Sequence, residues 1–132
     1  METISDMLRR HEGFRSKPYL DTVGVPTFGY GFTYITKAEA DMILSGRVVE
    51  LYNSCSAKWP WFEELCDIRK IVIMDMAYNL GITGLSRLTS VIAAVSSGRW
   101  ADAAAAMLST LWAKQVKGRA RELAGMIMLP GE

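Results

Sequence analysis

The sequence predicts a mostly helical α+β fold organised around one apolar helix. Residues 62–80 are apolar on nearly every helical face, which is typical of a central, buried helix. Apolar side chains recur at the spacing of amphipathic helices in several other segments. Residues 25–31 instead alternate aromatic side chains with glycines, a pattern that indicates a short strand whose backbone a ligand can approach closely.

The first helix is predicted to end at Glu12. Thr3 and Asp6 resemble a capping box, and Gly13 is a natural stop after the last turn. The apolar stripe of this helix comprises Ile4, Met7, Leu8 and His11. The negative end of the helix dipole favours a carboxyl group that keeps its proton, and cover by Phe14 would act in the same direction. Glu12 is therefore a candidate general acid.

A second carboxyl group follows in a different environment. Asp21 lies in a polar run with turn character, where a carboxylate stays solvated and ionised. Different environments permit different protonation states, so one carboxyl can protonate a leaving oxygen while the other orients water or stabilises developing positive charge. Thr27 adds a neutral hydroxyl that could hold that water. From the spacing alone, both carboxyls are more simply interpreted as ordinary surface residues.

Three motifs in this order and spacing resemble the catalytic signature of the phage T4-type lysozymes, the muramidase endolysins. The motifs are a helix ending in Glu12-Gly13, Tyr19-x-Asp21-Thr22-x-Gly24, and Thr27-x-Gly29-x-Gly31. By position, the resemblance implies that Glu12 is the acid, Asp21 the second carboxylate and Thr27 the water-positioning hydroxyl. It also implies hydrolysis of the β-1,4 bond between N-acetylmuramic acid and N-acetylglucosamine in peptidoglycan, with inversion at the anomeric carbon.

The same resemblance implies a lysozyme-like fold with two lobes. A small N-terminal lobe, about residues 1–60, would contain an abbreviated β region, and a helical lobe, about 61–132, would follow. A long central helix would join them. Phe32 stands where the family commonly has histidine, which alters one wall of the cleft. The resemblance assigns substrate contacts to Gly31, Phe32, Tyr78, Asn79 and Arg119, with the arginine facing the catalytic glutamate.

The remaining elements are predicted from caps, stripes and breaks. A capping box at Thr36–Glu39 starts a helix that runs to about Tyr52, and residues 53–61 are expected to form a connection. Three further helices are indicated by apolar stripes at residues 88–95, 100–112 and 120–127. Gly81 is expected to stop the long apolar helix, and breaks are expected at residues 97–98 and 116–118.

Two features of the middle of the chain have alternative interpretations. Trp59, Trp61 and Phe62 could stack on sugars, but docking of the next helix onto the core is the simpler interpretation. Asp75 lies within the apolar helix and is expected to reach a polar edge or to pair with a basic residue, with a catalytic role as the less simple alternative. Trp100 and Trp112 are expected in the core.

Composition limits the class of protein. At 132 residues, half of them hydrophobic and 22% charged, the chain fits one compact domain. A formal net charge of +1 lacks the Lys/Arg excess that phosphate neutralisation requires, so we expect no nucleic-acid partner. Cys55 and Cys66 are expected to be free thiols, with a disulfide as the alternative. Because a zinc site needs four ligands and His11 is the only histidine, no metal site is expected. We also expect no cofactor.

The expected location follows from the lack of targeting signals. The N-terminus has neither the basic start nor the apolar core of a signal peptide, and no 18-residue apolar run indicates stable membrane insertion. We therefore expect a monomer in the host bacterial cytoplasm that reaches glycan strands of the periplasmic wall through a holin-type lesion. The alternatives are a lytic transglycosylase, and an inactive wall- or partner-binding domain with the same fold.

Overall fold

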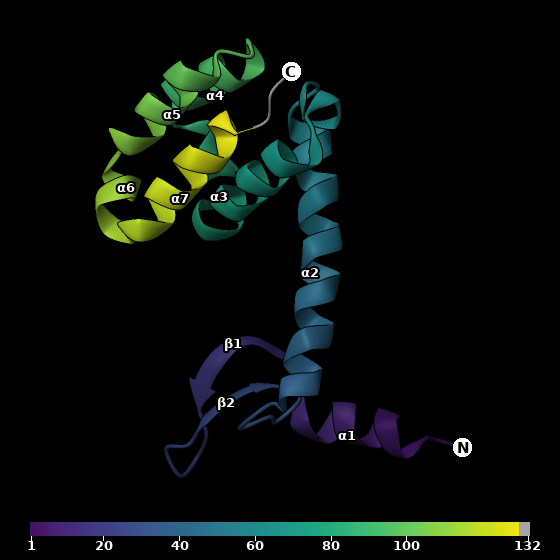
Figure 1. Ribbon diagram of the computed structural model, residues 1–132. Helices are drawn as coiled ribbons and strands as arrows, with labels where there is room; N and C mark the ends of the chain where they lie inside the picture. Colours follow the sequence, from purple (N-terminus) through teal and green to yellow (C-terminus); the bar gives the residue numbers. More distant parts are fainter. Residues whose placement is uncertain (130–132) are drawn as a thin grey trace. The chain divides into compact units, whose positions relative to one another are not determined.

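The computed structural model describes residues 1–129 and contains helices and two paired strands (Figure 1). The elements are α1 Ile4–Glu12, β1 Arg15–Leu20, β2 Pro26–Gly29, α2 Lys37–Lys58, a 3₁₀ helix Phe62–Glu64, α3 Asp67–Ser86, α4 Thr89–Ser96, α5 Trp100–Leu108, α6 Leu111–Val116 and α7 Gly118–Met128. The predicted mostly helical α+β fold is confirmed. Contacts divide the chain into two compact units, Met1–Ser45 and from Gly46 onward. The lobe boundary expected near residue 60 stays a prediction.

The first unit begins with α1, which forms as its caps predict. The side chain of Thr3 accepts a hydrogen bond from the backbone N–H of Asp6 at 3.1 Å. Gly13, with φ of 68°, follows the last residue and donates its N–H to the carbonyl of Arg9. The helix therefore ends at Glu12, where the last free carbonyls create the negative end of the dipole.

The sheet of the first unit is a short antiparallel pair. β1 and β2 pair with Tyr19 opposite Thr27, and the register shifts between Arg15 and Tyr19. At the end of β2, Phe28 forms an isolated antiparallel bridge with Phe32, with both hydrogen bonds at 2.8 Å. The expected strand is therefore present, and within residues 1–129 the β structure is as brief as the sequence indicates.

Helix α2 is longer than expected. Thr36 and Glu39 form the predicted capping box, with reciprocal hydrogen bonds of 3.0 and 3.2 Å. The helix then continues to Lys58, so the connection predicted for residues 53–61 is wrong over its first six positions. Cys55 and Trp59 lie one turn apart and are both buried, so core packing outweighs the turn propensity of the polar residues around them. This helix runs from the first unit into the second.

Helix α3 begins later than the apolar pattern suggests. Residues 62–64 form a 3₁₀ turn, and the α-helix starts only at Asp67. Gly81 has φ of 78° and interrupts the helix where a stop was predicted, but helical structure resumes and ends at Ser86. The buried face before the interruption comprises Arg69, Val72, Ile73, Met76 and Ala77. The predicted buried helix is therefore present, although it is displaced toward the C-terminus.

The C-terminal stripes form four helices rather than three. The stripe at residues 100–112 was expected to be one helix, but Thr110 caps a new one by accepting a hydrogen bond from the N–H of Ala113 at 3.1 Å. A threonine that satisfies a free N–H at a helix start favours a break there. The other breaks are confirmed at Gly98, with φ of 69°, and at Lys117, with φ of 50°.

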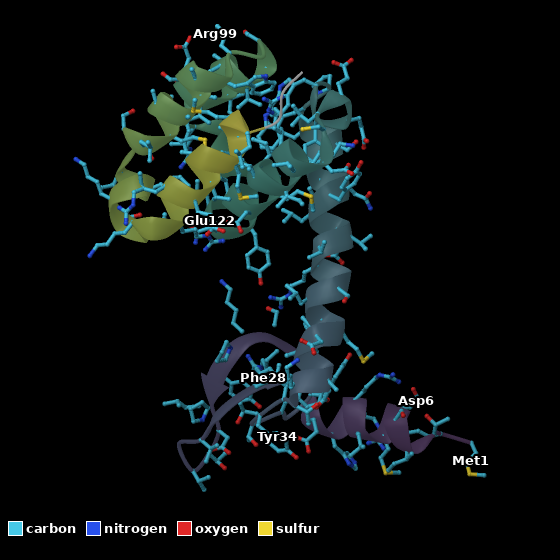
Figure 2. All side chains as sticks on the ribbon, in the orientation of Figure 1. Met1, Asp6, Phe28, Tyr34, Arg99 and Glu122 are labelled. Atoms are coloured by element: carbon cyan, nitrogen blue, oxygen red, sulfur yellow. The ribbon has the colours of Figure 1, made fainter. Side chains whose placement is uncertain are left out.

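The core lies in the second unit. Trp59, Phe62 and Trp112 are buried, which supports docking rather than sugar stacking for the first two and confirms the core position of the third. Arg69, which the sequence did not single out, is also buried; its Nε donates to the carbonyl of Ile127 at 2.9 Å, and its guanidinium lies 3.7 Å from the ring centre of Trp100. Outside the core, Arg99 and Glu122 are exposed on the surface of the second unit (Figure 2).

Both cysteines are free thiols, as expected. Cys55 is fully buried, and burial raises the pKa of its thiol to about 11. Cys66 is partly buried. None of the helices within residues 1–129 has the length and apolar character needed to cross a membrane.

Candidate functional site

The candidate acid lies at the C-terminal end of α1. Glu12 is exposed, and Phe14 is 62% exposed, so the carboxyl is not buried under Phe14. Phe14 packs against Tyr30 instead, with ring centres 5.5 Å apart.

The Glu12 carboxyl rests against the backbone of Gly31. A Cβ atom added at Gly31 would lie 2.5 Å from Oε2 and 2.8 Å from Cδ of Glu12. The carboxyl therefore occupies the space that a side chain at position 31 would take. Gly31 also has φ of 73°, which a residue with a side chain rarely adopts.

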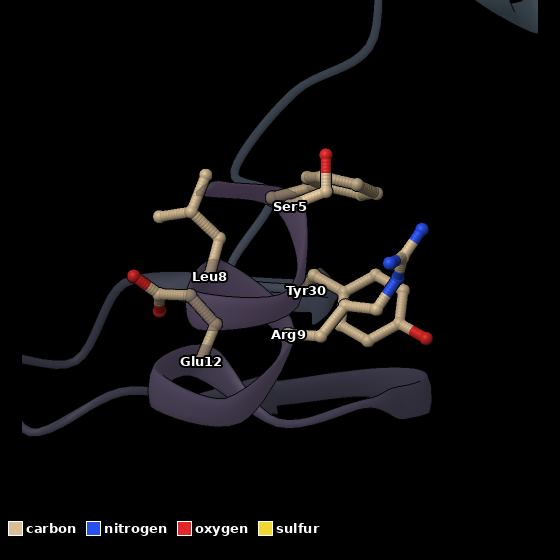
Figure 3. Close-up of a pocket in the computed structure, with 6 residues that line it drawn as sticks. Ser5, Leu8, Arg9, Glu12 and Tyr30 are labelled. Carbon is tan, nitrogen blue, oxygen red and sulfur yellow. The ribbon is translucent and has the colours of Figure 1, made fainter. Parts of the chain in front are cut away.

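A hollow of about 290 Å³ opens beside this carboxyl (Figure 3). Its lining residues are Ser5, Leu8, Arg9, Glu12, Tyr30 and Phe32. The guanidinium of Arg9 and the carboxyl of Glu12 point in opposite directions, and Arg9 pairs with Asp6 at 3.1 Å (Figure 3). The hollow thus combines one acidic group, one basic group and two aromatic rings.

The sequence did not single out Ser5 and Arg9 as site residues. Both lie on the same helical face as Glu12, seven and three residues before it. Listing the residues that share the helical face of Glu12 would have identified both as neighbours of the candidate acid. Tyr30 was recognised only as part of the strand pattern, because nothing in the sequence shows that the turn after β2 faces α1.

Asp21 and Thr27 are joined through the backbone of Val25. Asp21 Oδ1 accepts hydrogen bonds from the N–H of Val23 at 2.9 Å and from that of Val25 at 2.8 Å. The carbonyl of Val25 accepts from the N–H of Asp21 at 3.0 Å and from the Thr27 hydroxyl at 2.9 Å. The turn predicted at Asp21 and the strand predicted at Thr27 are thus confirmed. The side chains of Asp21 and Thr27 are both held by the backbone of Val25.

Phe32 completes the turn after β2. Its ring lies over Gly29, where an added Cβ would come within 2.5 Å of a ring carbon. The ring also packs edge-on against Phe28 and Tyr30, with centres 5.8 and 6.4 Å apart. Phe32 is therefore fixed as one wall of the hollow.

Three predicted substrate residues belong to the second unit. Tyr78 is 52% exposed, and Asn79 Oδ1 accepts a hydrogen bond from Trp112 Nε1 at 2.7 Å. Arg119 Nε donates to Asp75 Oδ1 at 2.7 Å, which confirms that Asp75 pairs with a basic residue. The sugar contacts assigned to Tyr78, Asn79 and Arg119, and the orientation of Arg119 toward the glutamate, stay predictions.

The comparison with known families decides the class of protein. The sequence model of the phage lysozyme family matches residues 9–128. The chain belongs to this family. The match includes Glu12, Asp21 and Thr27, as well as the helices of the second unit. Within residues 1–129, no three His, Cys, Asp or Glu side chains gather as metal ligands would.

Individual relatives are distant. The chain is 27% identical to the pre-baseplate central spike protein Gp5 of Enterobacteria phage T4, over 98% of this chain but only 28% of the spike protein. It is 22% identical to the probable T4-type lysozyme 1 of Dictyostelium discoideum, over 96% of this chain and 94% of the relative. The probable T4-type lysozyme 2 of that organism is also 22% identical, over 93% of this chain and 92% of the relative. These alignments extend over 156 to 163 residues, so the relatives contain residues that have no counterpart among the 132 residues of this chain.

Proposed function

We propose that this chain hydrolyses the β-1,4 bond between N-acetylmuramic acid and N-acetylglucosamine in peptidoglycan. The observation that carries the proposal is the joint attachment of Asp21 and Thr27 to Val25, on the same short segment that supports Glu12. A carboxylate and a neutral hydroxyl held together are suited to bind one water molecule. Membership of the phage lysozyme family supports the choice of a glycan substrate.

The hydrogen bonds define how the water would be held. Asp21 Oδ1 is occupied by two backbone N–H groups, while Oδ2 has no hydrogen-bond partner within residues 1–129. Thr27 donates its proton to the carbonyl of Val25, so its oxygen is left as an acceptor. A water that donates one proton to each of these oxygens keeps a lone pair free for attack. Asp21 then receives the proton that the water loses.

The acid acts on the opposite side of the scissile bond. Glu12 donates its proton to the glycosidic oxygen as the bond to the anomeric carbon breaks, and water attacks the other face of the sugar. An inverting enzyme of this kind separates its carboxyl groups by roughly 6.5–9.5 Å so that the water fits. A β-linked substrate would therefore give the α-anomer first, with the mass of one added water.

The biological role is part of the same proposal. As an endolysin of a phage or prophage, the protein would accumulate in the host cytoplasm as a monomer and reach the periplasmic wall after a holin opens the membrane. The family name supports a phage origin of the fold. Expression of the protein in a bacterial cytoplasm with and without a holin tests this requirement, because the cells should lyse only when the inner membrane is opened.

The deciding experiment follows the products formed from purified peptidoglycan. Early-time proton NMR and mass spectrometry should find a hydrated, initially α-anomeric reducing end. The Glu12→Gln variant keeps the shape of the side chain, but its amide is too weak an acid to protonate the leaving oxygen, so its rate should fall at least about 10²-fold while it remains folded. Products with a 1,6-anhydro ring would identify a lytic transglycosylase. An initial β-anomer would identify a retaining enzyme, and no cleavage by the parent protein would leave a binding domain.

A further inference from the structure

Two glycines in the turn at residues 28–32 have no room for a side chain. A Cβ on Gly29 would lie 2.5 Å from the Phe32 ring, and one on Gly31 would lie 2.5 Å from Oε2 of Glu12. Gly98 in the second unit has a similar backbone, with φ of 69° against 73° at Gly31, but a Cβ there would meet its nearest atom at an ordinary 3.8 Å. The contact with the carboxyl is therefore specific to Gly31 and does not follow from its backbone conformation.

The turn that carries Gly31 is held on both sides. Phe28 and Phe32 exchange two backbone hydrogen bonds of 2.8 Å across it. The Phe32 ring covers Gly29 and packs against Phe28 and Tyr30. The peptide at Gly31 therefore presents a fixed surface to the end of α1. By contrast, Glu12 is an exposed side chain with several rotatable bonds, so a fixed neighbouring surface restricts where its carboxyl can lie.

We propose that Gly31 is a positioning residue for the Glu12 carboxyl. The inference rests on the proposed function, because it assumes that Glu12 donates a proton. The space that a side chain at position 31 would fill is occupied by the carboxyl of Glu12. The family resemblance had assigned Gly31 to substrate contact instead. A methyl group there would displace the carboxyl by about an ångström, and a misplacement of that size can cost about 10²-fold in rate.

The first test compares Gly31→Ala with Gly98→Ala. Both variants place a methyl group on a glycine with positive φ, so they share the backbone strain, but only Gly31→Ala pushes against Glu12. With soluble peptidoglycan fragments, we expect Gly31→Ala to lower kcat about 10²-fold with little change in KM. Gly98→Ala should keep the parental kcat. A Gly31→Ala variant that is folded and has the parental kcat would overturn the proposal.

A double-mutant cycle separates displacement of the acid from general damage. Glu12→Asp shortens the side chain by one methylene, which leaves space for the added methyl group. Gly31→Ala should therefore cost much less in the Glu12→Asp background, no more than about threefold, because residues in contact are not additive. An equal loss in both backgrounds would mean that Gly31 acts through the turn or the substrate, and the proposal would fail.

A measurement without substrate distinguishes this proposal from the proposed function. With ¹³C-labelled glutamate carboxyls, the Glu12 resonance is assigned as the one that disappears in Glu12→Gln. Gly31→Ala should shift it, and Gly98→Ala should leave it in place. A parent protein that cleaves nothing but shows this shift would refute the hydrolase and retain the contact. An active parent whose Glu12 resonance does not respond to Gly31→Ala would refute the positioning role.

Discussion

Asp21 and Thr27 hydrogen-bond to opposite backbone groups of the same residue, Val25. The carboxylate of Asp21 accepts from its N–H at 2.8 Å, and the hydroxyl of Thr27 donates to its carbonyl at 2.9 Å. Because Thr27 is only 4% exposed, its hydroxyl has little freedom to adopt another arrangement. The backbone hydrogen bonds occupy Asp21 Oδ1 and the proton of the Thr27 hydroxyl, so Asp21 Oδ2 and the Thr27 oxygen are the groups that the proposed mechanism assigns to water.

Thr27→Val removes the hydroxyl while keeping the branched shape of the side chain. We expect a loss of activity of about 10²-fold, because the water loses one of its two acceptors, a loss within the range seen for groups that position reactants. The free energy of unfolding should fall by about 1 kcal/mol for the lost hydrogen bond. Thr27→Ser is the matched control, since it keeps the hydroxyl that donates to the Val25 carbonyl and that would accept from the water. If Thr27→Val matched the rate of Thr27→Ser, the hydroxyl would not hold the catalytic water.

Asp21→Asn and Asp21→Ala distinguish the contribution of Asp21 to the stability of its loop from its contribution to the catalytic rate. The asparagine oxygen can still accept from the N–H groups of Val23 and Val25, so we expect its stability to be close to the parental value. Its rate should nevertheless fall about 10²-fold or more, because the amide cannot take a proton from water. Asp21→Ala should lose both the catalytic rate and the hydrogen bonds to the loop, so its free energy of unfolding should be about 1 kcal/mol below that of the parent by thermal or denaturant unfolding. An active Asp21→Asn variant would restrict Asp21 to a structural role.

Local signals predicted the parts of the site that depend on neighbouring residues. The end of α1 at Glu12, the turn at Asp21 and the strand at Thr27 follow from capping, turn and strand patterns, and each is present. Contacts that join separate segments could not be predicted in this way. The contact between the Glu12 carboxyl and Gly31 depends on how the turn at residues 28–32 folds back on α1.

The errors in the helices have the same origin. The polar residues 53–56 have turn propensity, but burial of Cys55 and Trp59 extends α2 to Lys58. The stripe at residues 100–112 is continuous in apolar character, so the pattern did not reveal the cap at Thr110. Arg69 was missed because a buried arginine depends on partners far along the chain, here the Ile127 carbonyl and the Trp100 ring.

The Asp75–Arg119 pair links α3 to α7 and should show coupling in stability. Arg119 Nε lies 2.7 Å from Asp75 Oδ1, and Arg119 Nη2 donates to the Asp75 carbonyl at 3.4 Å. Both side chains are 38% exposed, so we expect a coupling of only about 0.5–1 kcal/mol. A double-mutant cycle with Asp75→Asn and Arg119→Gln, measured by denaturant unfolding at low and high salt, gives this value. Zero coupling at low salt would contradict the pair.

The buried thiol of Cys55 should make stability depend on pH in the alkaline range. Its pKa is raised to about 11 by burial, from an ordinary value near 9.0. Above pH 9 the unfolded chain loses this proton while the folded chain keeps it, so the folded state binds more protons and the free energy of unfolding falls as pH rises toward 11. Well below pH 9 the thiol is protonated in both the folded and the unfolded chain, so it contributes no slope there.

Cys55→Ala is the control that isolates this effect from the lysines and tyrosines that also titrate above pH 9. The difference in the free energy of unfolding between parent and variant should be constant from pH 7 to about 8.5 and should then narrow. In the folded parent at pH 8, iodoacetamide should modify Cys66 before Cys55, because the buried thiol is neither accessible nor ionised. After unfolding without reductant, two free thiols should titrate. A difference that does not change with pH, or rapid alkylation of Cys55 in the folded protein, would show that this thiol is not buried in solution.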